Sequence, residues 1–142
     1  MNLISNETLY LYFDGSETIL KNRTNEYRGR GNLVKAILNQ SCIYYGSSLD
    51  GRIKGTKGIL NCKYKLPVII SEKNQIVLFP VKSDLGLIWF NFKNIKGFEK
   101  YGDKVKIEFN NSTVKEFEIS YAIFNNQMLK CSRLWLVYLS RC

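Results

Sequence analysis

The chain has 142 residues and a net charge of +9, from 21 Lys and Arg against 12 Asp and Glu. It contains no histidine and no Cys-x-x-Cys pair, so we expect no zinc site, no cofactor and no histidine-based catalysis, which argues against an enzyme. It has no run of about 18 apolar residues and no basic N-terminal region, so we expect no membrane span, no signal peptide, and a cytoplasmic location with reduced cysteines.

The first elements predicted along the chain are two strands. Residues 9–13 are rich in strand formers, and residues 14–16 supply turn chemistry before a return strand over 18–20. Residues 28–31 read Arg-Gly-Arg-Gly and indicate either a flexible basic turn or a slim segment that could enter the minor groove of DNA.

A helix and a glycine-rich segment follow. Asn32 is predicted to cap a helix over 33–41, whose apolar residues share one face. Four glycines fall between residues 46 and 58, which predicts a loop there. Residues 46–53 nearly match the phosphate loop of nucleotide triphosphatases, but Arg52 and Ile53 occupy the positions of the required lysine and hydroxyl residue.

The second half of the chain reads mainly as strands. Residues 68–70 and 76–79 predict a hairpin that ends at Pro80, and residues 87–92 predict a further strand. Aromatic residues in this half alternate with polar ones, which favours the core of a sheet over a surface for base stacking. These aromatic residues are Trp89, Phe90, Phe92, Phe98, Tyr101 and Phe109.

The last elements predicted are a half-buried strand and a helix. Val105, Ile107 and Phe109 alternate with charged residues, and a bulge is expected near Lys115. Ser120 is predicted to cap a C-terminal helix with one apolar face. That face comprises Tyr121, Phe124, Met128, Cys131, Trp135 and Tyr138. The pattern predicts an α+β fold, a single domain over 1–142, with a mainly antiparallel sheet, a central helix and a C-terminal helix.

The run from Leu134 to Leu139 is apolar on every side of the predicted C-terminal helix. A surface helix needs only one apolar stripe to cover its own core. The run could therefore complete the core or form a two-fold interface between copies of the chain, and the sequence leaves both open.

The positive charge is unevenly distributed. Residues 1–20 carry a net charge of −3, residues 21–65 carry +8, and residues 66–142 carry +4. A clustered basic surface is typical of proteins that bind nucleic acids. Hydroxyl and basic residues among the glycines suit a sugar-phosphate backbone, although a solvated turn explains them as well. The candidate DNA-binding residues are Arg28, Arg30, Lys35, Ser47, Ser48, Arg52, Lys54, Thr56 and Lys57.

Four blocks of residues, in order, support a family assignment. Residues 41–56 match the pattern S-C-x-x-[FY]-G-S-S-x-x-G-R-x-x-G-T, and the segments at 67–80, Trp89 and 120–127 follow with the expected spacing. Over roughly residues 33–139 the chain resembles the ComK family of competence regulators.

That resemblance implies a function and several partners. The family activates transcription of DNA-uptake genes in Gram-positive bacteria and binds paired AT-rich promoter boxes, largely through the minor groove. It acts as a homo-oligomer, and an adaptor and a Clp-type protease control its level. The alternatives are a module that binds DNA or RNA without sequence preference, and a paralogue that lacks full activator function.

Overall fold

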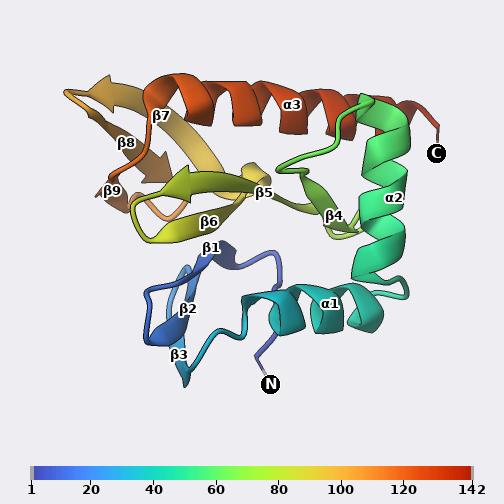
Figure 1. The fold of residues 1–142 in the computed structure, drawn as a ribbon, viewed down its shortest axis with the longest axis horizontal. Coiled ribbons are helices and arrows are strands. Elements are labelled where there is room, and N and C mark those ends of the chain that lie inside the picture. Colours follow the sequence, from blue (N-terminus) through green and yellow to red (C-terminus); the bar gives the residue numbers. More distant parts are fainter. Residues whose placement is uncertain (1, 142) are drawn as a thin grey trace.

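The computed structural model describes residues 2–141, which form two antiparallel sheets and three α-helices (Figure 1). The larger sheet has the order β3-β2-β1-β6-β5-β4, and the smaller has the order β7-β8-β9. The strands of the larger sheet are β1 (Thr8–Phe13), β2 (Glu17–Asn22), β3 (Glu26–Arg30), β4 (Val68–Ser71), β5 (Ile76–Ser83) and β6 (Gly86–Asn91). Those of the smaller sheet are β7 (Ile95–Tyr101), β8 (Lys104–Phe109) and β9 (Val114–Phe117).

The helices are α1 (Val34–Tyr44), α2 (Leu49–Leu60) and α3 (Tyr121–Ser140), with a short 3-10 turn η1 (Phe92–Asn94) between the sheets. In Figure 1, α3 lies along the top of the molecule and α1 along the bottom. Helix α2 runs down the right side, between the C-terminal end of α3 and the end of α1. None of the helices within residues 2–141 is long and apolar enough to cross a membrane. The predicted α+β class, with its antiparallel pairing, central helix and C-terminal helix, is confirmed.

The larger sheet is buried on both of its faces, and β5 shows why. Successive side chains of a strand point to opposite faces. Val77 and Phe79 therefore join the core beneath α3, whereas Ile76 and Leu78 join the core beneath α1 and the start of α2. A strand with two buried faces reads as a continuous apolar run, as β5 does.

Helix α3 packs against both sheets through the apolar face predicted for it. Ser120 is the N-cap, and its Oγ accepts a hydrogen bond from the Ile123 N–H (3.3 Å). The Phe124 ring packs against Phe79 (centroids 5.6 Å apart) and Phe90 (5.4 Å) of the larger sheet and against Phe98 (4.9 Å) of the smaller one. Most of the aromatic residues predicted to be core are buried or packed against it; Tyr101 is exposed.

Two predictions from glycine content are wrong. The glycine-rich segment forms α2 rather than a loop, because Ser48 caps the helix and Leu49, Thr56 and Leu60 anchor it in the interior. Tertiary packing thus outweighs the low helix propensity of glycine. The segment 28–31 is not a flexible turn, because residues as far as Arg30 belong to β3 and pair with β2.

Three smaller predictions are also corrected. Strand β5 continues through Pro80 to Ser83. The pairing with β4 extends only as far as Leu78 of β5, so β4 needs no N–H donor at Pro80. No bulge occurs near Lys115, since β8 and β9 pair in continuous register. Leu33, not Asn32, occupies the N-cap of α1, although Asn32 Oδ1 accepts a hydrogen bond from the Val34 N–H (3.2 Å).

Candidate nucleic-acid interface

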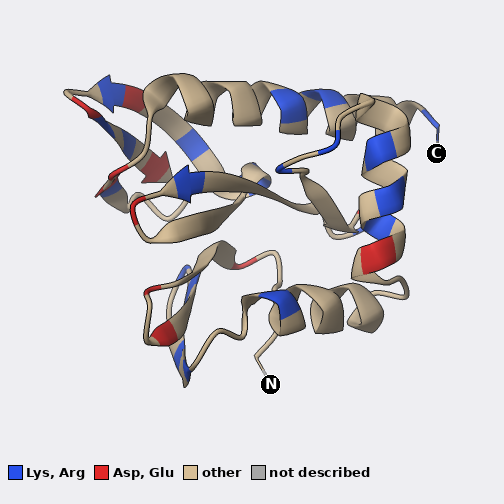
Figure 2. Ribbon diagram, in the orientation of Figure 1, with Lys and Arg blue, Asp and Glu red and all other residues tan. Residues whose placement is uncertain are grey.

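Basic residues of α2, of the segment after it and of α3 lie near the place where these three parts of the chain meet (Figure 2). We refer to Lys54 and Lys57 of α2, Lys63 and Lys65 of the segment after it, and Lys130 and Arg133 of α3 as the basic corner. Gln127 of α3 fixes the position of the segment after α2, because its Nε2 donates a hydrogen bond to the Lys65 carbonyl oxygen (2.9 Å). A hydrogen bond to the backbone of Tyr64 and the nearby Lys130 ammonium lower the pKa of the Cys62 thiol. Basic residues that are distant in sequence therefore lie near one another in the fold.

Little of the positive charge of the basic corner is neutralised by ion pairs. Among the ion pairs within residues 2–141, only one involves the corner: Lys54 Nζ lies 3.3 Å from Asp50 Oδ2, and both side chains are largely exposed. Exposed pairs of this kind contribute little and are screened by salt. Tyr64 stands between two of the lysines and is 80% exposed, so an aromatic ring is available beside the charges.

The outer face of α2 is open beside these lysines. Gly51, Gly55 and Gly58 are exposed, and a Cβ atom added at Gly55 or Gly58 would meet no atom within 4 Å. Without side chains, the helix backbone can approach a ligand surface closely. Lys54 and Lys57 flank these glycines, so an anionic surface could contact both the backbone and the ammonium groups.

Several of the predicted site residues make contacts that hold the helices together, and their contact with DNA stays a prediction. Ser48 Oγ accepts a hydrogen bond from the Gly51 N–H (3.1 Å) as the cap of α2. Thr56 is buried, and its Oγ1 donates to the Pro67 carbonyl oxygen (2.9 Å). Gly46 has a φ of +90°, a conformation that favours glycine, at the turn between α1 and α2. The motif at residues 41–56 is thus occupied largely in building the α1–α2 junction.

Arg52 has three partners from other parts of the fold. Its guanidinium donates to Ser47 Oγ (3.1 Å), to the Tyr138 hydroxyl (3.2 Å) and to Glu72 Oε2 (3.0 Å). The Arg52 side chain is only 16% exposed. These contacts join α2 to α3 and to the β4–β5 turn, which is a structural role. A contact between Arg52 and DNA stays a prediction.

We expect Arg52→Ala to lower the free energy of unfolding by about 1–3 kcal/mol, because hydrogen bonds to a charged, mostly buried partner are lost and Glu72 is left unpaired. Urea denaturation checks this prediction. The control is Lys54→Ala, at an exposed position on the same helix. A variant with unchanged stability and weaker duplex binding would contradict the structural role and favour a DNA contact.

The remaining predicted residues lie elsewhere. Arg28 and Arg30 belong to β3, on the side of the molecule away from α2 in Figure 1. Arg28 is paired with Glu26 (2.7 Å) and lies 3.7 Å from Glu17, so its charge is largely compensated locally. Lys35 is exposed in the first turn of α1. The structure therefore brings only Lys54 and Lys57 of the predicted set into the basic corner.

The other members of the corner were missed from sequence. Lys63 and Lys65 fall inside the basic segment 21–65, and their spacing around Tyr64 was a usable signal. Lys130 and Arg133 gave none, because they reach the corner only through the packing of α3 against α2.

Comparisons with known proteins agree with one another. The model of the ComK protein family matches residues 4–141. A curated protein called competence transcription factor, from Bacillus subtilis (strain 168), is 33% identical over 103 residues, which cover 70% of this chain and 53% of that protein. The chain thus spans about half the length of the curated relative it matches. No solved structure gives a significant match.

Proposed function

The chain belongs to the ComK family, and from this premise we propose that it is a DNA-binding transcriptional activator of competence genes. The observation that carries the proposal is the basic corner, a set of neighbouring cations with one weak acidic partner. Such a surface attracts the phosphate backbone, releases its counterions on binding and so supplies sequence-independent affinity. The relative is named a competence transcription factor, which supports the same function.

We assign the contact to AT-rich boxes read largely through the minor groove, as the family resemblance implies. The exposed glycines of α2 support a close approach of the backbone, and Lys54 and Lys57 lie beside them to contact phosphates. In this arrangement Arg28 and Arg30 on β3 and Lys35 on α1 would form a second contact with DNA or would not touch it. The chain would act as one domain, since α3 packs on strands of both sheets.

Inosine substitution tests the choice of groove. Replacing A·T pairs in the boxes by I·C keeps the acceptors of the minor groove and changes the pattern in the major groove. We expect affinity for the duplex, measured by fluorescence anisotropy, to change by less than about threefold, since a lost base contact would cost about 1–3 kcal/mol. A loss of tenfold or more would place a recognition element in the major groove.

Self-association through α3 is the second part of the proposal. Leu134 and Trp135 are buried in the core, whereas Leu129 and Leu136 are 61% and 65% exposed. These two leucines are seven residues apart and therefore share one face of the helix, where Leu139 is also exposed. Arg133 lies between these two leucines on the same face, so a two-fold interface there would cover it and leave the other basic residues of the two subunits to contact two DNA boxes.

The proposed DNA partner implies that the chain works in the bacterial cytoplasm. Control by an adaptor and a Clp-type protease stays a prediction from the family, because none of the described residues identifies a degradation signal.

A further inference from the structure

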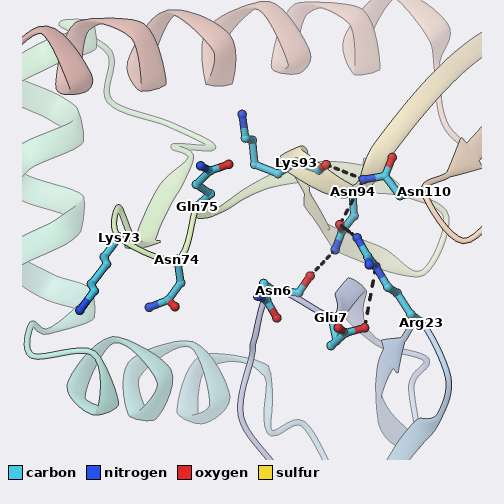
Figure 3. Close-up of a pocket in the computed structure, with 9 residues that line it drawn as sticks. All are labelled: Asn6, Glu7, Arg23, Lys73, Asn74, Gln75, Lys93, Asn94 and Asn110. Carbon is cyan, nitrogen blue, oxygen red and sulfur yellow. Dashed lines mark hydrogen bonds and ion pairs between the residues drawn. The ribbon is translucent and has the colours of Figure 1, made fainter.

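A polar cavity lies outside the basic corner, where loops from both sheets converge (Figure 3). The segment before β1, the turns β2–β3, β4–β5 and β8–β9, and η1 all contribute to it. Its volume is about 440 Å³, within the range of small-ligand sites. Amide side chains dominate its lining, so we refer to it as the amide pocket.

Asn94 is the fixed centre of the amide pocket. It is buried, and its Nδ2 donates to the carbonyl oxygens of Asn6 (2.9 Å) and Thr8 (2.7 Å). Its Oδ1 accepts from Arg23 Nη2 (3.0 Å) and from Asn110 Nδ2 (3.3 Å). Because the amide makes all of these bonds at once, the Arg23 guanidinium is held in position before any ligand arrives.

Arg23 retains unused hydrogen-bonding capacity. Its Nε is buried and has no hydrogen-bond partner, and the nearest carboxylate oxygen, Glu7 Oε2, is 3.8 Å away. A buried donor without a hydrogen-bond partner is costly, so it needs an explanation such as a water, an ion or a functional role. Arginine presents a planar fork that suits phosphate.

Two further basic residues, Lys73 and Lys93, lie at the rim of the amide pocket, with their ammonium groups directed away from Arg23. In Figure 3, Lys93 extends toward α3 and Lys73 lies at the β4–β5 turn, apart from Arg23. Lys93 Nζ lies 5.5 Å from the centroid of the Trp135 ring, and no described residue pairs with the Lys73 ammonium. Against these three cations the lining holds one acid, Glu7. The separation of the cations suits a ligand with more than one polar or anionic group.

The amides complete the recognition chemistry. Neither the Asn6 nor the Gln75 side chain makes a hydrogen bond to any described residue, and both line the cavity. Each amide offers donors and an acceptor, the groups that pair with the edge of a nucleobase or with ribose hydroxyls. We propose that the amide pocket binds a nucleotide, with its phosphate on the basic side chains and its base or sugar on the free amides. The nucleotide is either a free one or a member of a nucleic-acid strand.

NMR titration of the full chain tests this proposal. Backbone amide resonances are followed while AMP, ADP, inorganic phosphate and a single-stranded oligonucleotide are added in separate experiments. We expect saturable shifts at residues 73–75, 93–94 and 110 with at least one nucleotide-bearing ligand. Shifts with ADP identify a free nucleotide as the ligand, and shifts with the oligonucleotide alone identify a strand.

Variants decide whether these shifts come from the amide pocket. We expect Lys73→Gln combined with Lys93→Gln to weaken binding at least tenfold, because charge-assisted contacts are lost. Arg23→Lys keeps the charge but removes the planar fork, and should weaken binding as well. Lys82→Gln, on the far part of β5, is the matched control and should leave it unchanged.

The absence of saturable shifts with every nucleotide-bearing ligand, which includes the case of a response to inorganic phosphate alone, or shifts that persist in the double variant, would overturn the proposal. Resonances outside the pocket report whether each variant remains folded. The ADP titration contains no duplex DNA, so its result does not depend on the proposed promoter binding.

Discussion

Replacing Lys57, Lys63 and Lys130 together by glutamine should weaken binding to an AT-rich duplex on the order of 10- to 100-fold at moderate salt, with little change in stability. Each lysine is expected to contact a phosphate, so the slope of log affinity against log salt should fall by about 3. Fluorescence anisotropy at several salt concentrations gives both quantities. Circular dichroism of the same samples checks that the fold is intact.

The matched control removes the same charge from other surfaces. Lys82, Lys96 and Lys100 are exposed and lie outside the basic corner. Their triple replacement by glutamine should leave the salt slope unchanged and the affinity within a few-fold of that of the parent chain. If this control loses as much affinity as the corner variant, net charge alone drives binding and the location of the interface is wrong.

Neighbouring residues of α3 should respond in opposite ways to substitution. Trp135 is 6% exposed within the core, so Trp135→Ala should lower the free energy of unfolding by about 3–5 kcal/mol. Leu136 points to solvent, so Leu136→Glu should change stability by less than about 1 kcal/mol. Because a charge on the exposed leucine face opposes a two-fold contact, Leu136→Glu should instead give a monomer.

Urea denaturation and analytical ultracentrifugation separate these two effects. The expected pattern is a destabilised Trp135→Ala chain and a stable, monomeric Leu136→Glu chain that binds one DNA box weakly. A Leu136→Glu chain whose mass equals that of an associated parent would exclude this face of α3 from the interface. A parent chain that is itself monomeric at the concentrations used on DNA would contradict self-association in solution.

Part of this fold could be predicted from the sequence, because alternating apolar residues indicate strands and capping residues indicate helix ends. The alternating residues of β8 indicated a half-buried strand, and Ser120 before an apolar stripe indicated α3, because both patterns follow from backbone periodicity. Each of these elements satisfies its hydrogen bonds locally or with an adjacent strand. Their existence therefore depended little on distant parts of the chain.

Glycines caused the main errors, because glycine content does not reveal tertiary contacts. In α2 the cost of glycine is offset by the Ser48 cap and by buried anchors such as Leu60. In β3, an added Cβ at Gly29 would lie 2.7 Å from the Tyr27 hydroxyl and 2.8 Å from Leu33 Cδ1, so these side chains would have to move. Neither circumstance can be recognised before the neighbours are placed.

The candidate interface was only partly readable for a related reason. The net charge of segment 21–65 drew attention to Lys54 and Lys57, which are exposed in the structure. Composition could not separate them from Arg52 and Thr56, whose polar groups bind other parts of the protein. The contribution of Lys130 depends on the packing of α3 beside α2, a contact between segments about 70 residues apart.

We expect the chain to bind DNA with a preference for AT-rich promoter boxes. The most direct test measures the affinity of the full chain for an AT-rich paired-box duplex and for a GC-rich duplex of equal length, from 50 to about 400 mM salt. We predict that both affinities fall with salt and that the AT-rich duplex stays at least tenfold tighter throughout. Coincident curves for the two duplexes would contradict sequence preference and leave a nucleic-acid-binding module of general affinity.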